Sequence, residues 1–441
     1  MANETEFYKG KPVFLAANSK ELARAIAAYD GEAESPYVVR WSGKVSRVRE
    51  KAFEDDTKLG IILLPDTVIK IAEGAFSGCL NLTEVHFGES VQHIGENAFY
   101  GCTGLTSLFI PASVVGIANG AFENCSSLAS IDVSPNNPYW DSREDCNSLI
   151  YTRNNCLRFG CKSSFIPKTV VSIGKGAFVG CTGLAAITIP SSVKVIEDWP
   201  FAHCTGLKSI NIPDSVVKIG RCAFEGCTEL VSANIPELLR DSDIGYNLFS
   251  GCTSLKDVRI PSSWTEIPNC IFDGCTSLPS FTIPEGVTRI GGGAFANCTG
   301  LTSIVIPDSV NEIGPEAFAG CSSLVSISIP DAVTALYRNV FASCKSLSSI
   351  ILPDSITDIP HLAFYHCESL KEFTIPKGVT EIGIWAFRGC SSLTSITIPD
   401  TVTTIHREAF ADCVAMKEIR IKNPGLLEGS GIGQGVKIIT D

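Results

Sequence analysis

The chain has 441 residues, of which 45% are hydrophobic, and its formal net charge is −12. It contains no cluster of lysine and arginine, so the electrostatic footprint expected of a nucleic-acid-binding protein is absent. No window of the sequence is long and apolar enough for a transmembrane helix. These properties argue against nucleic acid as a partner and against a membrane-spanning protein.

Residues 1–44 lie outside the internal repeat and are predicted to form an N-terminal cap. Ser19 followed by residues 20–29 predicts a short N-capped helix, and residues 37–41 predict a strand. The terminal units of a repeat array need such a cap to cover the open end of the core. The segment has no apolar stretch typical of a signal peptide, which makes a cytoplasmic location the alternative to secretion.

From residue 45 to residue 421 the sequence repeats itself, with a period of 23 residues. One copy, residues 304–324, reads IVIPDSVNEIGPEAFAGCSSL. Ile304 and Ile306 alternate with outward positions, as in a half-buried strand, and Pro307 ends that strand. One phenylalanine marks each copy, at positions 53, 76, 99, 122, 178, 201, 224, 249, 272, 295, 318, 341, 364, 387 and 410. A fixed period of this size predicts a solenoid of about fifteen coils, each burying its apolar face against its neighbours.

The pattern Leu-x-x-Ile-x-Ile-Pro-x-x-Val-x-x-Ile-Gly-x-x-Ala-Phe-x-x-Cys resembles that of the BspA-type leucine-rich repeat family. The resemblance implies a right-handed leucine-rich-repeat horseshoe or superhelix with a parallel β-sheet on its concave face. It also implies a secreted or surface-exposed bacterial protein that adheres to host matrix or serum proteins, or to another cell-surface protein.

Residues of about 132–165 interrupt the period and predict an inserted β-hairpin that projects from the edge of the solenoid. Tyr139 and Trp140 lie in this insertion and are one candidate contact point for a partner, because aromatic residues are enriched at binding hot spots. Residues 422–441 leave the pattern again and are predicted to form a C-terminal cap, in which residues 436–439 add a last strand.

The chain has 19 cysteines, and fourteen of them occupy a single repeat position. A residue placed once per coil predicts a ladder of buried free thiols, because cysteine is a small hydrophobic residue. No convergent Cys-x-x-Cys cluster suggests a metal site. Cys146 and Cys161 both lie in the insertion, where a disulfide between them would staple the hairpin, and free thiols are the alternative.

No catalytic constellation, metal site or cofactor site is predicted, since the six histidines are scattered through the coils. The other candidate site is the solvent face of the strands, which carries small polar residues and a few apolar ones. Its candidate ligand-binding residues are Phe109, Asn211, Asn234, Arg259, Val305, Ser328 and Ile351. A soluble sheet face with no ligand is the alternative interpretation.

The sequence therefore predicts a non-enzymatic protein-binding or adhesion module that recognises a macromolecular partner over an extended surface. An intracellular scaffold or regulatory protein-interaction module is the second hypothesis, since the chain shows no leader and contains many unpaired cysteines.

Overall fold

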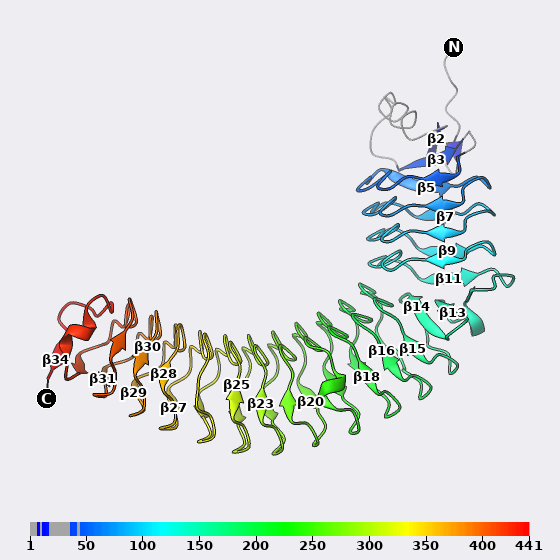
Figure 1. Ribbon diagram of the computed structural model, residues 1–441. Helices are drawn as coiled ribbons and strands as arrows, with labels where there is room; N and C mark the ends of the chain where they lie inside the picture. Colours follow the sequence, from blue (N-terminus) through cyan, green and yellow to red (C-terminus); the bar gives the residue numbers. More distant parts are fainter. Residues whose placement is uncertain (1–6, 9–10, 17–35, 42–44, 441) are drawn as a thin grey trace, which may run out of the picture. The chain divides into compact units, whose positions relative to one another are not determined.

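Figure 1 shows the computed structural model of the chain, which describes residues 7–8, 11–16, 36–41 and 45–440. The chain divides into two compact units, Met1–Ile219 and Gly220–Asp441. In both units the described residues form stacked coils of a parallel-strand β-solenoid with almost no helix, about 18 turns in all. The predicted solenoid is confirmed, and strands at the two ends and in the insertion add turns to the fifteen that the repeat predicts.

Most coils contain a strand of two to five residues that includes the alternating apolar positions; the coil with Ile187 and Ile189 does not. Many successive strands of this kind pair in parallel and in register, as Ser280–Thr282 does with Ser303–Val305. These strands are β5 (Leu59–Leu63), β7 (Glu84–His86), β9 (Ser107–Ile110), β11 (Ser130–Val133) and β17 (Ser209–Ile210) in the first unit, and β19 (Ser232–Asn234), β20 (Asp257–Arg259), β22 (Ser280–Thr282), β24 (Ser303–Val305), β26 (Ser326–Ser328), β27 (Ser349–Ile351), β29 (Glu372–Thr374), β31 (Ser395–Thr397) and β33 (Glu418–Arg420) in the second.

Most coils also contain a two-residue strand that ends on a buried apolar residue, isoleucine in all but one. These strands are β4 (Arg47–Val48), β6 (Lys70–Ile71), β8 (His93–Ile94), β10 (Gly116–Ile117), β15 (Ser172–Ile173), β16 (Val195–Ile196) and β18 (Lys218–Ile219), then β21 (Glu266–Ile267), β23 (Arg289–Ile290), β25 (Glu312–Ile313), β28 (Asp358–Ile359), β30 (Glu381–Ile382) and β32 (Thr404–Ile405). Short 3-10 helices occur at η1 (Arg143–Asp145), η2 (Asp241–Asp243) and η3 (Pro424–Leu427). The helix η2 lies in the coil that is two residues longer than the others.

The repeat phenylalanines form the centre of the core. From Phe224 to Phe410 their rings stack coil on coil, with centroid separations of 5.3–6.1 Å and interplanar angles of 1–29°. In the first unit Phe53, Phe76, Phe99 and Phe122 stack in the same way at 5.1–5.4 Å. Offset aromatic stacking adds to the apolar area that these rings bury.

The repeat cysteines form a second ladder beside the phenylalanines. Twelve of these thiols donate to the backbone carbonyl oxygen of the phenylalanine in the preceding coil, over sulfur–oxygen distances of 3.0–3.3 Å, whereas Cys181 donates to the Gly160 carbonyl oxygen at 3.6 Å. These pairs are Cys79–Phe53, Cys102–Phe76, Cys125–Phe99, Cys204–Phe178, Cys252–Phe224, Cys275–Phe249, Cys298–Phe272, Cys321–Phe295, Cys344–Phe318, Cys367–Phe341, Cys390–Phe364 and Cys413–Phe387. The position therefore suits cysteine because the side chain is small and apolar and still offers a weak donor.

The ladder thiols are expected to be chemically inert in the folded protein. Burial raises the pKa of the Cys125 and Cys344 thiols to about 12, so at pH 8 only about one in ten thousand is the reactive thiolate. Iodoacetamide at pH 8 should leave both unmodified in the native chain and should alkylate both in denaturant, as peptide mass spectrometry would show. Half-buried Cys270 is the internal control and should react first. Rapid native labelling of Cys344 would contradict the buried ladder.

The N-terminal strands extend the sheet of the first unit. Here β1 (Phe7–Tyr8), β2 (Lys11–Ala16) and β3 (Tyr37–Trp41) precede β5 in the order β1-β2-β3-β5-β7. The Trp41 ring meets the Phe53 ring edge to face at 5.9 Å and so covers the end of the phenylalanine stack. The predicted strand at residues 37–41 is confirmed, whereas the helix predicted after Ser19 lies outside the described residues.

The C-terminal segment adds a last strand, as predicted. β34 (Lys437–Ile439) pairs in parallel with β33, with Ile438 opposite Ile419. The loop between them contains η3, which begins after Asn423, and the Asn423 side chain accepts a hydrogen bond from the Gly425 amide.

The insertion forms a hairpin, but the hairpin does not project from the solenoid as predicted. β12 (Trp140–Asp141), β13 (Ser148–Tyr151) and β14 (Cys156–Gly160) pair antiparallel, and β14 then pairs in parallel with β15 of the next coil. Leu149, Leu157 and Phe159 are buried in the core. The insertion therefore forms one coil of the solenoid, because its apolar residues occupy the core between Phe122 and Phe178.

Candidate functional site

The strands present alternate residues to the core and to solvent. In β24, Ile304 is buried while Ser303 and Val305 are exposed, and β22, β26, β29 and β31 show the same pattern. The predicted assignment of inward isoleucines and outward neighbours is thus correct. In both units, we call the outward positions of the strands that contain the alternating apolar residues the strand face.

The structure places two of the seven candidate residues of the strand face in the first unit and five in the second. Phe109, half exposed, lies on β9 opposite Asp132, and Asn211 follows β17; both belong to the first unit. The other five, Asn234, Arg259, Val305, Ser328 and Ile351, belong to the second unit. There the strand register places Asn234 beside Arg259 and Ser328 beside Ile351.

The most exposed apolar side chains of the strand face lie in the middle of the second unit. Val305 is 78% exposed and Ile351 is 64% exposed. They lie on β24 and β27, and β26 with Ser328 runs between them, in contact with both. At the usual strand spacing the two side chains are about 10 Å apart. Apolar side chains grouped on an otherwise polar sheet face are typical of an interaction site.

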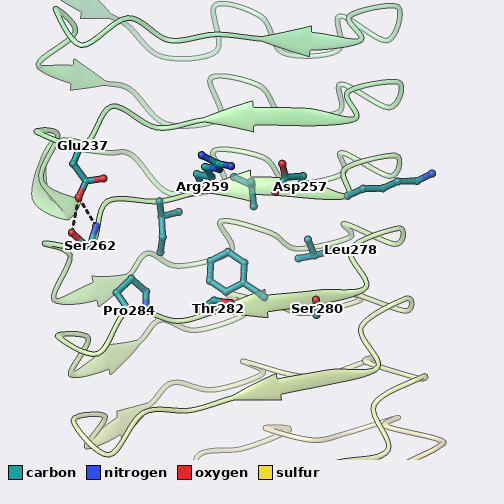
Figure 2. Close-up of a pocket in the computed structure, with 12 residues that line it drawn as sticks. Glu237, Asp257, Arg259, Ser262, Leu278, Ser280, Thr282 and Pro284 are labelled. Atoms are coloured by element: carbon teal, nitrogen blue, oxygen red, sulfur yellow. Dashed lines mark hydrogen bonds between the residues drawn. The ribbon is translucent and has the colours of Figure 1, made fainter.

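A slot opens in the strand face between β20 and β22, with a volume of about 550 Å³ (Figure 2). Arg259 and Asp257 on β20 and Ser280 and Thr282 on β22 lie along its mouth. Its other lining residues are Glu237, Lys256, Val258, Ile260, Ser262, Leu278, Phe281 and Pro284. The volume lies within the range of small-molecule and side-chain pockets in proteins.

A proline lies beside the slot. Each neighbouring coil donates a backbone hydrogen bond just before this strand, from Lys256 to Val231 and from Thr302 to Pro279. Pro279 occupies the donor position of its own coil and has no N–H to offer. The strands β20 and β22 are not paired in the described part of the chain, and neither are β24 and β26 or β27 and β29, whose coils have no proline at this position.

A phenylalanine occupies the central core position of β22 beside the slot, as Phe373 does in β29. Phe281 stands where Ile304 and Ile327 stand in later coils, and its ring packs against Phe272 and Phe295 at 4.9 and 5.2 Å. On β20, Val258 and the following Ile260 are only half-buried, whereas the corresponding Ile304 and Ile306 are each 7% exposed. The equivalent Ile350 and Leu352 at β27 are half-buried as well, so this partial exposure of core residues occurs in two coils. Sequence reasoning missed the slot, although Pro279 is a visible departure from the repeat.

The insertion does not offer the aromatic contact point that was predicted. Trp140 is only 4% exposed, and its indole N–H donates to the Val115 carbonyl oxygen at 3.2 Å. Asn137 holds the segment in place, since its side-chain amide donates to the Pro111 and Val114 carbonyl oxygens of the preceding coil. Tyr139 is half-buried beneath the Arg153 guanidinium. The prediction for Trp140 was wrong because its turn-rich surroundings resembled an exposed loop.

The cysteines of the insertion are free thiols in the structure. Cys146, Cys156 and Cys161 are all buried, and no disulfide joins Cys146 to Cys161. The Ser164 hydroxyl donates to the Cys161 sulfur at 3.6 Å, and the Cys146 sulfur lies 3.9 Å from the Ser142 hydroxyl oxygen. Burial raises the pKa of all three thiols. Hydrogen bonds and apolar packing, and not a covalent link, hold the hairpin.

The possible metal ligands are the His, Cys, Asp and Glu side chains. In the described part of the chain no group of three or more His, Cys, Asp and Glu side chains is placed to bind a metal ion. His361 and His406 meet edge to face at 5.6 Å, and the His406 Nε2 lies 2.8 Å from a Glu381 carboxylate oxygen. Among the described residues no helix is a candidate membrane span.

Comparison with known proteins places this geometry in a family. The BspA type leucine rich repeat region (6 copies) matches residues 46–149, 153–278, 242–371 and 357–426. A leucine-rich repeat protein from Bacteroides ovatus is 27% identical, with a TM-score of 0.56 over 80% of this chain and 88% of that chain.

Two further solved structures are similar over most of their length. A leucine rich cell surface protein from Faecalibacterium prausnitzii is 28% identical, with a TM-score of 0.47 over 78% of this chain and 87% of that chain. A leucine-rich repeat protein from Eubacterium ventriosum is 21% identical, with a TM-score of 0.40 over 80% and 82%. No curated protein matches. Since the family pattern covers most of the sequence and the repeat geometry accompanies it, the chain belongs to the BspA type leucine-rich repeat family.

Proposed function

We propose that the protein is a non-enzymatic adhesion module that binds a partner protein through the strand face of its second unit. The family is a protein-interaction family, which supports binding as the general role. The observation that carries the proposal is the exposure of Val305 on β24 and Ile351 on β27, with one strand, β26, between them. A few apolar anchors surrounded by polar residues provide most of the affinity in protein interfaces.

The setting that we propose is the bacterial surface, with a host matrix or serum protein, or another cell-surface protein, as partner. Family membership supports this setting. An intracellular scaffold that binds its partner through the same face is the second candidate, and the many free buried thiols favour it because reduced cysteines persist in a reducing compartment.

The proposal is tested by screening the purified chain against a panel of matrix and serum proteins by biolayer interferometry. Any partner is then titrated against the double variant Val305→Glu/Ile351→Glu, which places two carboxylates at the proposed anchors. We expect its affinity to fall by about a hundredfold, since two desolvated anchors are lost. The matched control is Val414→Glu, because Val414 is 83% exposed in the same unit but lies outside the strands.

Binding that survives the double variant would place the site elsewhere. Binding lost equally with Val414→Glu would point to a general effect of charge. A panel without any partner would overturn adhesion to these proteins and leave the intracellular scaffold as the better hypothesis.

A further inference from the structure

A row of carboxylates borders the strand face of the second unit where the proposed anchors lie. In the four successive coils of β22, β24, β26 and β27, a proline follows the strand, and the residue after the proline is acidic and exposed. These residues, which we call the acidic row, are Glu285, Asp308, Asp331 and Asp354. Asp308 comes three residues after Val305, and Asp354 comes three residues after Ile351. The acidic row therefore runs along one edge of the proposed binding surface.

The acidic row is not neutralised within the protein. None of its four carboxylates forms an ion pair or accepts a hydrogen bond from a described residue. At the same place in other coils, Asp66 accepts a hydrogen bond from the Glu89 amide at 2.9 Å, and Asp400 pairs with Lys422 at 3.0 Å. Like charges on neighbouring strands repel, so the unpaired row costs stability unless a cation from outside lies against it.

The rest of this surface is uncharged. The outward residues of the four strands are Ser280, Thr282, Ser303, Val305, Ser326, Ser328, Ser349 and Ile351. The four residues before each strand include one charged residue, Lys345, which pairs with Glu368 at 3.2 Å. The surface therefore has apolar anchors in its middle and unpaired negative charge along one edge.

The spacing of the anchors favours a helix as the occupant. Val305 and Ile351 lie two strands apart, about 10 Å, and residues seven apart on one face of an α-helix are separated by about 10.5 Å along its axis. The side chain between them, Ser328, is small and lets a helix approach closely. A helix also satisfies its own backbone hydrogen bonds, whereas an extended segment laid across these side chains finds no backbone partner.

We propose that the strand face of the second unit binds a cationic amphipathic helix of the partner protein, aligned with the direction in which the coils stack. This inference rests on the proposed function and names the class of partner. Apolar residues of the helix contact Val305 and Ile351, and lysine or arginine residues on one flank pair with the acidic row. Because only one edge of the surface is negative, the charged flank also fixes the direction of the helix.

The arrangement of the carboxylates favours side-chain cations over a metal ion. In the part of the chain that the structure describes, no group of three or more His, Cys, Asp and Glu side chains is placed to hold a metal. The four turns follow one another at the coil spacing of about 4.8 Å, so each carboxylate can pair with a different ammonium or guanidinium group. Such exposed pairs mainly set the association rate and the orientation, while the apolar anchors supply affinity.

The test uses the full chain and four fluorescein-labelled peptides of about 18 residues, long enough to form a helix. Three share an apolar face of leucines and carry lysine, glutamine or glutamate at the same positions of one flank. The fourth keeps the lysines and has serine in place of the leucines. By fluorescence anisotropy at low salt, we expect the lysine–leucine peptide to bind at least about tenfold more tightly than the other three, with a smaller difference at high salt because charges are screened.

Variants of the protein locate the binding site. Asp308→Asn/Asp331→Asn should weaken binding of the lysine–leucine peptide about tenfold and leave the glutamine peptide unchanged. The matched control is Glu229→Gln/Glu428→Gln, which removes the same charge from exposed positions away from β22–β27 and should change neither. Val305→Ser/Ile351→Ser should weaken both peptides alike, since both use the apolar anchors.

The outcomes separate this inference from the proposed function. The cationic helix is overturned by equal binding of the lysine and glutamine peptides, by a Kd above about 1 mM for the lysine–leucine peptide, or by an equal loss in the Glu229→Gln/Glu428→Gln control. Calcium that binds the native chain but not Asp308→Asn/Asp331→Asn in calorimetry would also overturn it, because the acidic row would then be a metal site. All these results leave intact a partner whose binding depends on Val305 and Ile351.

Discussion

Phe318→Ala is expected to lower the free energy of unfolding by about 3–5 kcal/mol, the usual cost of removing a fully buried aromatic ring. Phe318 has no exposed surface, and its ring stacks on Phe295 and Phe341 at 5.6 and 5.7 Å. Its removal leaves a cavity between three coils that the rigid backbone ladder keeps open. Urea unfolding followed by circular dichroism measures the loss.

Ser328→Ala is the matched control for this experiment. Ser328 lies ten residues further along the same array, but its side chain is exposed on the strand face between Val305 and Ile351. Its replacement should change stability by no more than about 0.5 kcal/mol, as is usual for exposed positions. A loss below about 1 kcal/mol for Phe318→Ala would contradict its place in the core, and a large loss for Ser328→Ala would mean that the two faces of the strand are reversed.

The sequence predictions were correct for the positions whose surroundings the repeat defines. A side chain such as Phe318 or Ile304 meets its own copy in the next coil, so its burial can be inferred from the period alone. The residues between these buried positions must point to solvent, because side chains alternate along a strand. Val305 and Ile351 were correctly placed in solvent for this reason. The hydrogen bonds from most repeat cysteine thiols to a phenylalanine carbonyl were not predicted, because they depend on the relative height of two coils.

The sequence was less informative where the repeat is broken. Between Phe122 and Phe178 no neighbouring copy defines the partner of each residue, so the register of β13 and β14 could not be predicted. Pro279 departs from the repeat with no change in length. It removes a backbone donor of one coil that faces an acceptor in another, and the sequence alone does not pair the two.

Trp140→Ala is expected to be the most damaging change in the insertion, with a loss of about 3–5 kcal/mol. The ring is buried and packs on Tyr151 at 5.2 Å, and the indole N–H donates to the Val115 carbonyl oxygen. Truncation removes this apolar contact and leaves the buried carbonyl oxygen without its donor. Thermal and urea unfolding of the full chain would measure the loss.

The same variant tests whether the insertion only supports the fold or also contacts the partner. If Trp140 is structural, the folded fraction of Trp140→Ala should bind any partner with unchanged affinity, while Val305→Glu/Ile351→Glu binds weakly at unchanged stability. Tyr139→Ala is the neighbouring control and should cost less, because Tyr139 is half-buried. A buried residue can weaken binding only by disturbing the fold. Weaker binding by a Trp140→Ala protein of unchanged stability would therefore mean that the insertion contacts the partner.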